Sequence, residues 1–352
     1  MRKFSKLLVL VVVFTMLGSI FAGCGGASSA PAADSANVSK GGDKIVVGLS
    51  LPTQREERWV RDKVTMEAKA KELGIDLKVQ VADNDMDKQT SQCENLISQG
   101  IKVLILAPQD GKAAAAIVDK AHAAGIKVIS YDRLILDTDV DIYMSFDNVK
   151  VGELQGQFIT SKVPKGNYII LSGDPGDNNA KLFKEGAMKY IKPLVDKGDI
   201  KVILDQPCKD WKAEEAMAAT ENALTKTNNK IDAILAPNDG TANGCIQALA
   251  AQGLAGKVPI TGQDAELAAA QRIVEGTQSM TIFKDTRELG KAAIEAAIKL
   301  AKGEDLKPNG KVNNGKIDVP SILLTPVAVD KDNLDKVLID SGYLKKEDVY
   351  KK

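Results

Sequence analysis

Short apolar runs rich in β-branched residues alternate with amphipathic stretches from Lys44 onward. The first runs are IVVGLSL, LKVQVAD, VLILAP and KVISYD, and the amphipathic stretches between them cover 55–73, 87–99 and 111–124. The runs lack the apolar–polar alternation of a half-exposed strand, which is typical of strands buried on both faces of a parallel sheet. Gly74, Gly100 and Gly125 follow the amphipathic stretches, where a helix commonly ends in a left-handed residue. The pattern therefore predicts a series of βα units.

The alternation restarts after Asp147 and Asn148, with a helix to about Lys162. The predicted strands of this second set are NYIILSG, IKVILDQ, IDAILAPN, KVPITGQD and QSMTIFK, and the helices between them begin near 179, 213, 240 and 265. A further helix over 286–302, the segment VPSILLTPVAV and a last short helix follow. The sequence therefore predicts an α/β protein with two doubly wound parallel-sheet lobes.

The first 43 residues differ in composition from the rest. Arg2, Lys3 and Lys6 precede an apolar run, which is typical of a secretory signal. The run ends in FAGC at 21–24 and resembles the lipobox of bacterial lipoproteins, which implies cleavage after residue 23 and acylation of Cys24. The alternative is an ordinary secretory signal cleaved elsewhere. Residues 24–43 are small and polar and predict a flexible tether, so we expect an extracytoplasmic protein anchored to the cell membrane by lipid.

Composition excludes several classes of function. The 47 Lys and Arg residues balance the 47 Asp and Glu residues, so the composition does not indicate a positive electrostatic potential that would attract nucleic acid. A single histidine, His122, lies in a helical pattern away from the predicted strand ends, and four cysteines are too few for a dense zinc or disulfide framework. Cys93 and Cys245 fit small buried positions, whereas a Cys208–Cys245 bridge stays open.

No metal site or cofactor is predicted. Asp83, Asp85, Asp87 and Glu94 have part of the spacing of a calcium loop, but Lys88 stands where that loop needs glycine. A polar loop next to a helix N-terminus is the better interpretation. The glycines of the tether lack the strand, helix and Lys-Ser/Thr pair of a phosphate loop.

Polar and aromatic residues gather where the predicted strands end, and ligands of open parallel sheets bind beyond the carboxyl ends of the strands. The residues at these ends are Arg58, Trp59, Asp132, Arg133, Asp174 to Asn179, Trp211, Asn238, Asp239, Gln263, Asp264 and Lys284. Carboxylates, amides and cations of this kind can pair with the hydroxyls of a pyranose sugar, each of which costs roughly 1–3 kcal/mol when buried unpaired. The only two tryptophans, Trp59 and Trp211, suit the apolar C–H faces of the ring, one from each half of the chain.

Several segments together carry a resemblance that runs from Lys44 to the C-terminus. They are REERW (55–59), SYDR (130–133), SFDN and KVGELQ (145–155), GDNNAKLF (176–183), NNKIDAILAPND (228–239), CIQALAAQGL (245–254), GQDAEL (262–267) and GTQSMTIFK (276–284). The chain resembles the type I periplasmic-binding-protein family, most closely its xylose-binding members. The resemblance implies two lobes, 44–147 plus 285–318 and 148–284 plus 319–352, joined by three crossings near Asp147, 283–285 and 318–323.

The resemblance also implies the roles of individual residues. Sugar hydroxyls would be bound by Arg58, Arg133, Asp177, Asn179, Asn238, Asp264 and Lys284. Trp59 and Trp211 would stack on the ring. The chain departs from the family pattern at Asp174, Gly176 and Cys208, next to these positions.

The function implied is capture of D-xylose and its delivery to an ABC-transporter permease. A receptor that passes its sugar-dependent closure to a membrane sensor kinase is the alternative, and glucose stays open as a second ligand, because pentose and hexose differ by one CH₂OH group. An enzyme would use Asp177 with Asp264 as a glycosidase pair, or Lys284 as a Schiff-base lysine. No activated nucleophile, metal cluster or cofactor motif accompanies them, so we expect no catalytic residue. A repressor with the same core would carry a helix-turn-helix where this chain has its signal and tether.

Overall fold

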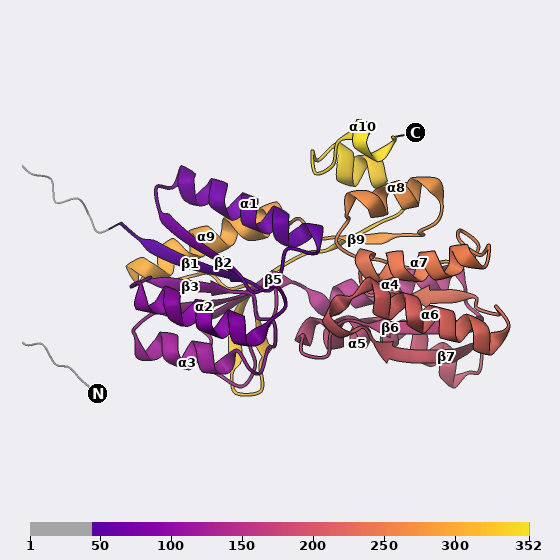
Figure 1. Cartoon of the computed structure of the whole chain (residues 1–352), viewed down its shortest axis with the longest axis horizontal. Coiled ribbons are helices and arrows are strands. Elements are labelled where there is room, and N and C mark those ends of the chain that lie inside the picture. Colours follow the sequence, from indigo (N-terminus) through magenta and orange to yellow (C-terminus); the bar gives the residue numbers. More distant parts are fainter. Residues whose placement is uncertain (1–43, 352) are drawn as a thin grey trace, which may run out of the picture. The chain divides into compact units, whose positions relative to one another are not determined.

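The computed structural model describes residues 44–351, so the predicted signal peptide, Cys24 and the tether lie outside the described residues (Figure 1). The first lobe is built on a seven-stranded sheet with the order β10-β11-β5-β4-β3-β1-β2. Adjacent strands in this sheet are parallel, except that β10 and β11 are antiparallel. Its strands are β1 (Val46–Leu51), β2 (Asp76–Val81), β3 (Val103–Leu106), β4 (Lys127–Tyr131), β5 (Ile142–Phe146), β10 (Gly310–Asn313) and β11 (Asp318–Leu324).

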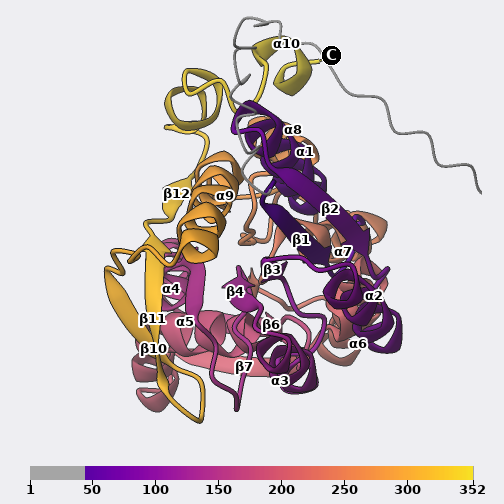
Figure 2. The same ribbon diagram turned by 90° about the vertical axis from the view of Figure 1, so that its left-hand side faces the viewer.

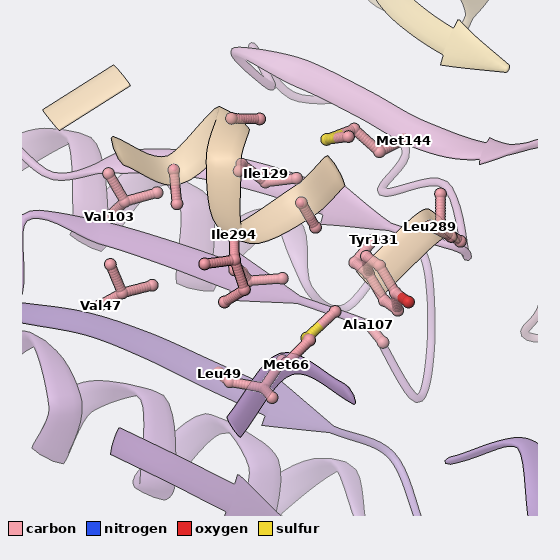
Figure 3. Close-up of a cluster of buried hydrophobic side chains, with 14 of the residues drawn as sticks. Val47, Leu49, Met66, Val103, Ala107, Ile129, Tyr131, Met144, Leu289 and Ile294 are labelled. Carbon is pink, nitrogen blue, oxygen red and sulfur yellow. The ribbon is translucent and has the colours of Figure 1, made fainter. Parts of the chain in front are cut away.

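Helices cover both faces of this sheet, which explains why its strands are apolar on both sides (Figure 2). α1 (Glu57–Glu72) and α9 (Thr286–Lys302) pack on one face, and α2 (Met86–Ser98) and α3 (Ala115–Ala123) on the other. In Figure 3, Ile294 and Leu289 of α9 lie over the same cluster as Val47 and Leu49 of β1. The last quarter of the chain thus completes the core that the first residues begin.

The second lobe is built on a smaller parallel sheet with the order β7-β6-β8. A separate antiparallel pair, β9 with β12, adjoins it. The strands are β6 (Gly166–Ser172), β7 (Ile200–Pro207), β8 (Ala233–Leu235), β9 (Thr281–Phe283) and β12 (Val327–Val329). The helices are α4 (Asn148–Lys162), α5 (Asn178–Asp196), η1 (Lys209–Trp211), α6 (Ala213–Thr227), α7 (Asp239–Ala251), α8 (Leu267–Glu275), η2 (Asp335–Ile339) and α10 (Lys346–Val349). The α/β fold of two lobes is therefore as predicted.

Two predicted strands turn out differently. The run KVPITGQD makes only one bridge, between Ile260 and Ile234, because Pro259 has no N–H to donate to a ladder. The run VPSILLTPVAV is divided at Pro326 into β11 and β12. β11 stays paired with β5 up to Leu324, so the chain leaves the first sheet after that residue and not at the predicted division between 318 and 319. β12 then joins the second lobe through β9.

Glycines bring α4 and α5 into close contact. A Cβ built at Gly152 would overlap the backbone of Phe183, and one at Gly186 would overlap the carbonyl of Val149. These positions tolerate no side chain unless one helix moves. The close approach fixes the N-terminal end of α4 against α5, whose first turn lines the pocket described below.

The remaining candidates for chemistry have structural partners. Cys93, Cys208 and Cys245 are buried free thiols, so no Cys208–Cys245 bridge is present, and burial raises the pKa of the latter two to about 12. His122 Nε2 lies 2.8 Å from Asp141 Oδ2.

The loop with calcium-like spacing is organised by its own side chains. Asp85 caps α2 by accepting from the Lys88 N–H at 2.9 Å, and the Lys88 ammonium pairs with Asp83. Within the span 44–351, no helix has both the length and the apolar character needed to cross a membrane.

Candidate functional site

The residues predicted to bind a ligand meet in one pocket between the lobes. All nine line it: Arg58, Trp59, Arg133, Asp177, Asn179, Trp211, Asn238, Asp264 and Lys284. The pocket holds about 320 Å³ outside the protein atoms, part of it open to solvent.

In the first lobe, a buried ion cluster holds Arg58. Its Nη2 lies 2.9 Å from Asp62 Oδ2 and its Nη1 lies 2.5 Å from Asp132 Oδ1, while the hydroxyl of Tyr131 donates to Asp62. Burial raises the pKa of Asp62 to about 6 in spite of Arg58. Burial would also raise the pKa of Asp132, but Arg58 and Lys284 outweigh it and hold that pKa below its ordinary value. Arg58 is thereby fixed in one orientation toward the pocket.

A second buried pair joins the two lobes. Arg133, after β4, places its Nε 2.9 Å from Asp177 Oδ2 at the start of α5. The other carboxylate oxygen of Asp177 caps α5 by accepting from the Asn179 N–H at 2.9 Å. Burial raises the pKa of Asp177, against the lowering effect of Arg133. The pair forms only when the lobes are together, so it links the site to closure.

Lys284 and Asp264 form the third ion pair. Lys284 Nζ lies 3.1 Å from Asp264 Oδ1 without hydrogen-bond geometry, so that oxygen keeps its capacity to accept from a ligand. The ammonium also lies 5.9 Å from the Phe146 ring centroid and 5.7 Å from that of Phe183. Asp264 has a left-handed backbone, with φ at 94°, and its N–H donates to the carbonyl of Ile282.

The two asparagines are occupied to different degrees. Asn179 Nδ2 donates to the Asp132 carbonyl at 2.9 Å and its Oδ1 accepts from Asn148 Nδ2 at 2.9 Å, so both ends of its amide contact protein. Asn238 Oδ1 accepts from the N–H and the hydroxyl of Thr241 at the start of α7. The Nδ2 group of Asn238 is the end left to donate to a ligand. Direct binding by Asn179 stays a prediction.

The two tryptophans are nearly buried, with 2% of Trp59 and 8% of Trp211 exposed. The Arg58 guanidinium carbon lies 4.2 Å from the Trp59 ring centroid, and Phe183 packs edge-on against Trp211 at 6.3 Å. Behind the Trp211 indole lies Gly173, where a Cβ would overlap the ring. Both indoles are thus fixed in place by their surroundings.

A buried acidic group supports the loop that carries Asp264. Asp239, fully buried at the start of α7, accepts from Gln278 Nε2 at 2.7 Å, from Thr281 Oγ1 at 3.0 Å and from the Glu266 N–H at 3.0 Å. Burial raises the pKa values of Asp239 and Glu266, the Asp264 carboxylate raises both further, and Asp239 adds to the rise at Glu266. These bonds hold the chain on both sides of the pocket loop.

Four further residues line the pocket: Glu56, Asp132, Phe183 and Gln263. The sequence places Asp132 and Gln263 at strand ends without giving either a role. Phe183 lies on α5, where an apolar residue is typical of the core. Glu56 is one of four consecutive charged residues, Arg55 to Arg58, and directly precedes α1. The signal that could have found Glu56 is its position two residues before the Arg58-Trp59 pair.

The charges and free polar atoms of the pocket indicate the kind of ligand. Three cations (Arg58, Arg133 and Lys284) face four anions (Glu56, Asp132, Asp177 and Asp264), and most are already paired, so no strong field selects an ion. Four buried polar atoms of its lining residues have no hydrogen-bond partner within residues 44–351: Glu56 Oε2, Trp211 Nε1, Gln263 Oε1 and Asp264 Oδ1. Buried polar groups are normally satisfied, so these atoms indicate a neutral ligand with several hydroxyls.

Comparison with known proteins agrees with this geometry. A D-xylose-binding periplasmic protein of Escherichia coli (strain K12) is 47% identical over 313 residues, which cover 89% of this chain and 95% of that protein. The multiple sugar-binding periplasmic receptor ChvE of Rhizobium radiobacter is 40% identical over 324 residues, covering 86% and 92%.

Among solved structures, a carbohydrate transporter solute binding protein of Chloroflexus aurantiacus in complex with D-glucose superposes with a TM-score of 0.81 at 38% identity, covering 87% of this chain and 98% of that one. The family model described as a periplasmic binding protein domain matches residues 47–305. The chain therefore belongs to the periplasmic binding protein family.

Proposed function

We propose that the protein is an extracytoplasmic receptor that captures one D-xylose molecule between its lobes and delivers it to an ABC-transporter permease. The observation that carries this proposal is the set of four unpartnered buried polar atoms in a pocket flanked by two indoles. A pyranose supplies hydroxyls for the unpartnered polar atoms and C–H faces for the indoles. The relatives named for D-xylose and for several sugars support the same ligand class.

Binding would favour the closed state because the pocket walls come from both lobes. Trp59 and Trp211 come from different lobes, as do Arg133 and Asp177. A sugar that contacts both walls binds the closed form better than the open form, and this differential affinity drives closure. The permease would then recognise the closed, loaded form.

The chain is a binding protein and not an enzyme, in keeping with its family. The carboxylates that a glycosidase would use are engaged otherwise, because Asp177 pairs with Arg133 and Asp264 lies beside Lys284. We propose that each serves as a hydroxyl acceptor, and that no cofactor takes part.

The test is calorimetric titration of the purified protein with D-xylose, D-glucose, D-ribose and L-arabinose in turn. We expect D-xylose to bind with the highest affinity and D-glucose more weakly, because the pocket must find room for one further CH₂OH group. Equal affinity for D-xylose and D-glucose would show that the receptor has a broader aldopyranose specificity than the proposed specificity for D-xylose. No binding of any of the four would refute the sugar-receptor proposal.

The partner in the membrane is tested separately. Deletion of the gene is expected to abolish xylose uptake. If uptake persists and only the transcriptional response to xylose is lost, the partner is a membrane sensor kinase and the permease role is wrong.

We also propose that Cys24, outside the described residues, carries the lipid that anchors the protein. Replacement of Cys24 by alanine should move the protein from the membrane fraction to the soluble extracytoplasmic fraction and abolish incorporation of radiolabelled fatty acid. An unmodified protein that is already in the soluble extracytoplasmic fraction and incorporates no fatty acid would indicate an ordinary secretory signal.

A further inference from the structure

Asp174 lies just outside the pocket and holds two loops of the second lobe together. It follows β6 and is 8% exposed, and it does not line the pocket. Its Oδ1 accepts from the Gly176 N–H at 2.7 Å, and its Oδ2 accepts from the Asp210 N–H at 2.6 Å. The first bond orders the loop between β6 and α5, and the second reaches across to the loop after β7.

Each of these loops makes a backbone contact with the first lobe. The Gly176 carbonyl accepts from the Gly111 N–H at 2.9 Å, and the Asp210 carbonyl accepts from the Arg55 guanidinium. A Cβ at Gly176 would lie 2.9 Å from Asp110 Oδ2 and 3.0 Å from Asp174 Oδ1, so the approach of the lobes is tight there. One carboxylate is therefore bonded to both loops that reach across the cleft at this edge.

The same carboxylate fixes the backbone that presents Trp211. Asp210 and Trp211 are consecutive left-handed residues, with φ at 53° and 57°. A bulky L-residue in this region is strained and stays there only when its surroundings impose it. Asp174 supplies a charged acceptor to the Asp210 N–H, and Gly173 provides the flat surface against which the indole lies.

We propose that Asp174 is a positioning residue for sugar binding, which couples the orientation of Trp211 to closure of the lobes. It does so without touching the ligand, through its bonds to the loops of Gly176 and Asp210. This inference rests on the proposed function, since it names a determinant of the same site. In the free protein it also predicts a property of Trp211 that requires no sugar.

The first measurement is ¹⁹F NMR of protein labelled with 5-fluorotryptophan, whose two resonances are assigned with a Trp59→Phe variant. In the ligand-free protein, Asp174→Ala is expected to shift or broaden the Trp211 resonance and to leave the Trp59 resonance in place. The second measurement is calorimetric titration with D-xylose, for which we expect an affinity on the order of ten-fold lower, because bonds to a charged acceptor are lost.

Asp205→Ala is the matched control. Asp205 is a carboxylate of the adjacent strand β7 that pairs with Lys184 at the surface, 2.5 Å away, and Lys184 does not line the pocket. This variant should leave both tryptophan resonances in place and keep the xylose affinity within two-fold of that of the unmodified protein. Asp174→Asn keeps one acceptor oxygen and should give an intermediate affinity, which covers the case in which Asp174→Ala fails to fold.

Two results would overturn the inference. One is an Asp174→Ala or Asp174→Asn protein, folded by its melting curve, with unchanged xylose affinity and an unchanged Trp211 resonance. The other is reduced affinity with an unmoved Trp211 resonance, which would assign Asp174 an electrostatic role. If the unmodified protein binds no sugar, the proposed function fails, while the ligand-free NMR comparison still decides whether Asp174 positions Trp211.

Discussion

Several residues around the pocket hold left-handed backbone conformations although none of them is glycine. They are Asp132, Asp210, Trp211, Asp264 and Ala265, with φ between 50° and 94°. Such residues cost about 1–3 kcal/mol each and persist where neighbours over-determine them. Here the neighbours are the buried carboxylates of Asp174 and Asp239 and the ion pairs of Arg58 and Lys284. The part of the pocket wall that each lobe contributes is therefore held in place within that lobe, so little ordering of these side chains opposes binding.

Trp211→Ala should weaken xylose binding roughly ten-fold or more, because a sugar face loses its stacking surface. The lobes should remain folded, since the indole lies at a loop and packs mainly on Gly173 and Phe183. Titration and a thermal melt measure the two effects. Tyr350→Ala, an exposed aromatic residue at the far C-terminus, is the control. An unchanged affinity for Trp211→Ala would exclude stacking on this residue.

Strand ends can be located in the sequence, and this explains why all nine predicted residues reach one pocket. The sequence does not show which of these side chains form hydrogen bonds within the protein and which are left to bind a ligand. Asn179 has a suitable side chain for a hydroxyl, yet its amide contacts Asp132 and Asn148. The hydrogen bond between Asp174 and the Asp210 N–H joins two loops that are 36 residues apart in sequence, so no local pattern reveals it.

At the scale of elements, α4 and α5 form the closest helix pair around the site. Gly152 and Gly156 of α4 face the backbone of α5, so the helix axes approach without intervening side chains. α4 carries Asn148 and α5 carries Asn179 in their first turns, and these two side chains are bonded to each other. Helix packing in the second lobe thus sets the geometry of the cleft.

Gly152→Ala should destabilise the protein by about 1–3 kcal/mol, because the added methyl group overlaps the backbone of Phe183 and one helix has to move. Gly240→Ala is the matched control in α7: its Cβ would have 3.7 Å to the nearest atom, Asn238 Nδ2, and alanine is the better helix former. Chemical denaturation compares the two variants. Equal stability would show that α4 and α5 can separate freely.

The periodicity of the sequence predicts the helices of both lobes and most strands to within a few residues, because buried parallel strands and amphipathic helices have distinct patterns. The prediction from periodicity is wrong at two strands that contain proline. Pro259 limits KVPITGQD to a single bridge, and Pro326 divides one apolar run between two lobes. The third crossing is expected near 318–323 but lies after Leu324, because both halves of that run are apolar and only strand pairing separates them.

At the scale of the whole molecule, buried carboxyls with raised pKa values surround the cleft. They are Asp62, Asp177, Asp239 and Glu266, and burial is the leading cause in each case. A group whose pKa is higher in the folded state binds its proton more tightly there, so its stabilising contribution is present at low pH and is lost as the pH rises through the folded pKa. Asp132 and Asp141 have lowered pKa values and contribute in the opposite direction.

The melting temperature should therefore rise as the pH falls from about 8 to about 5, and drop again below about pH 4, where the carboxyls with lowered pKa values are protonated. Glu266→Gln should flatten the slope between about pH 6 and pH 8, because it removes a carboxyl whose pKa is raised to about 8 in the folded protein. Glu304→Gln, at an exposed position, is the control. Calorimetric melts at constant ionic strength test this, and a melting temperature that climbs steadily from pH 5 to pH 8 would contradict it.

The position of α9 has a consequence for how the protein is made. The sheet face that α9 covers is formed by strands translated first, whereas α9 and β11 lie beyond residue 285. A ribosome therefore releases the whole segment 148–283, with its parallel sheet β7-β6-β8, before the first lobe can close its core. Val47, Leu49, Val103 and Ile129 are covered only in part, by α1, until α9 is made more than 150 residues downstream of all four. Long-range closure of this kind is slow, so the nascent chain stays in a form that folding helpers and a translocation channel can engage.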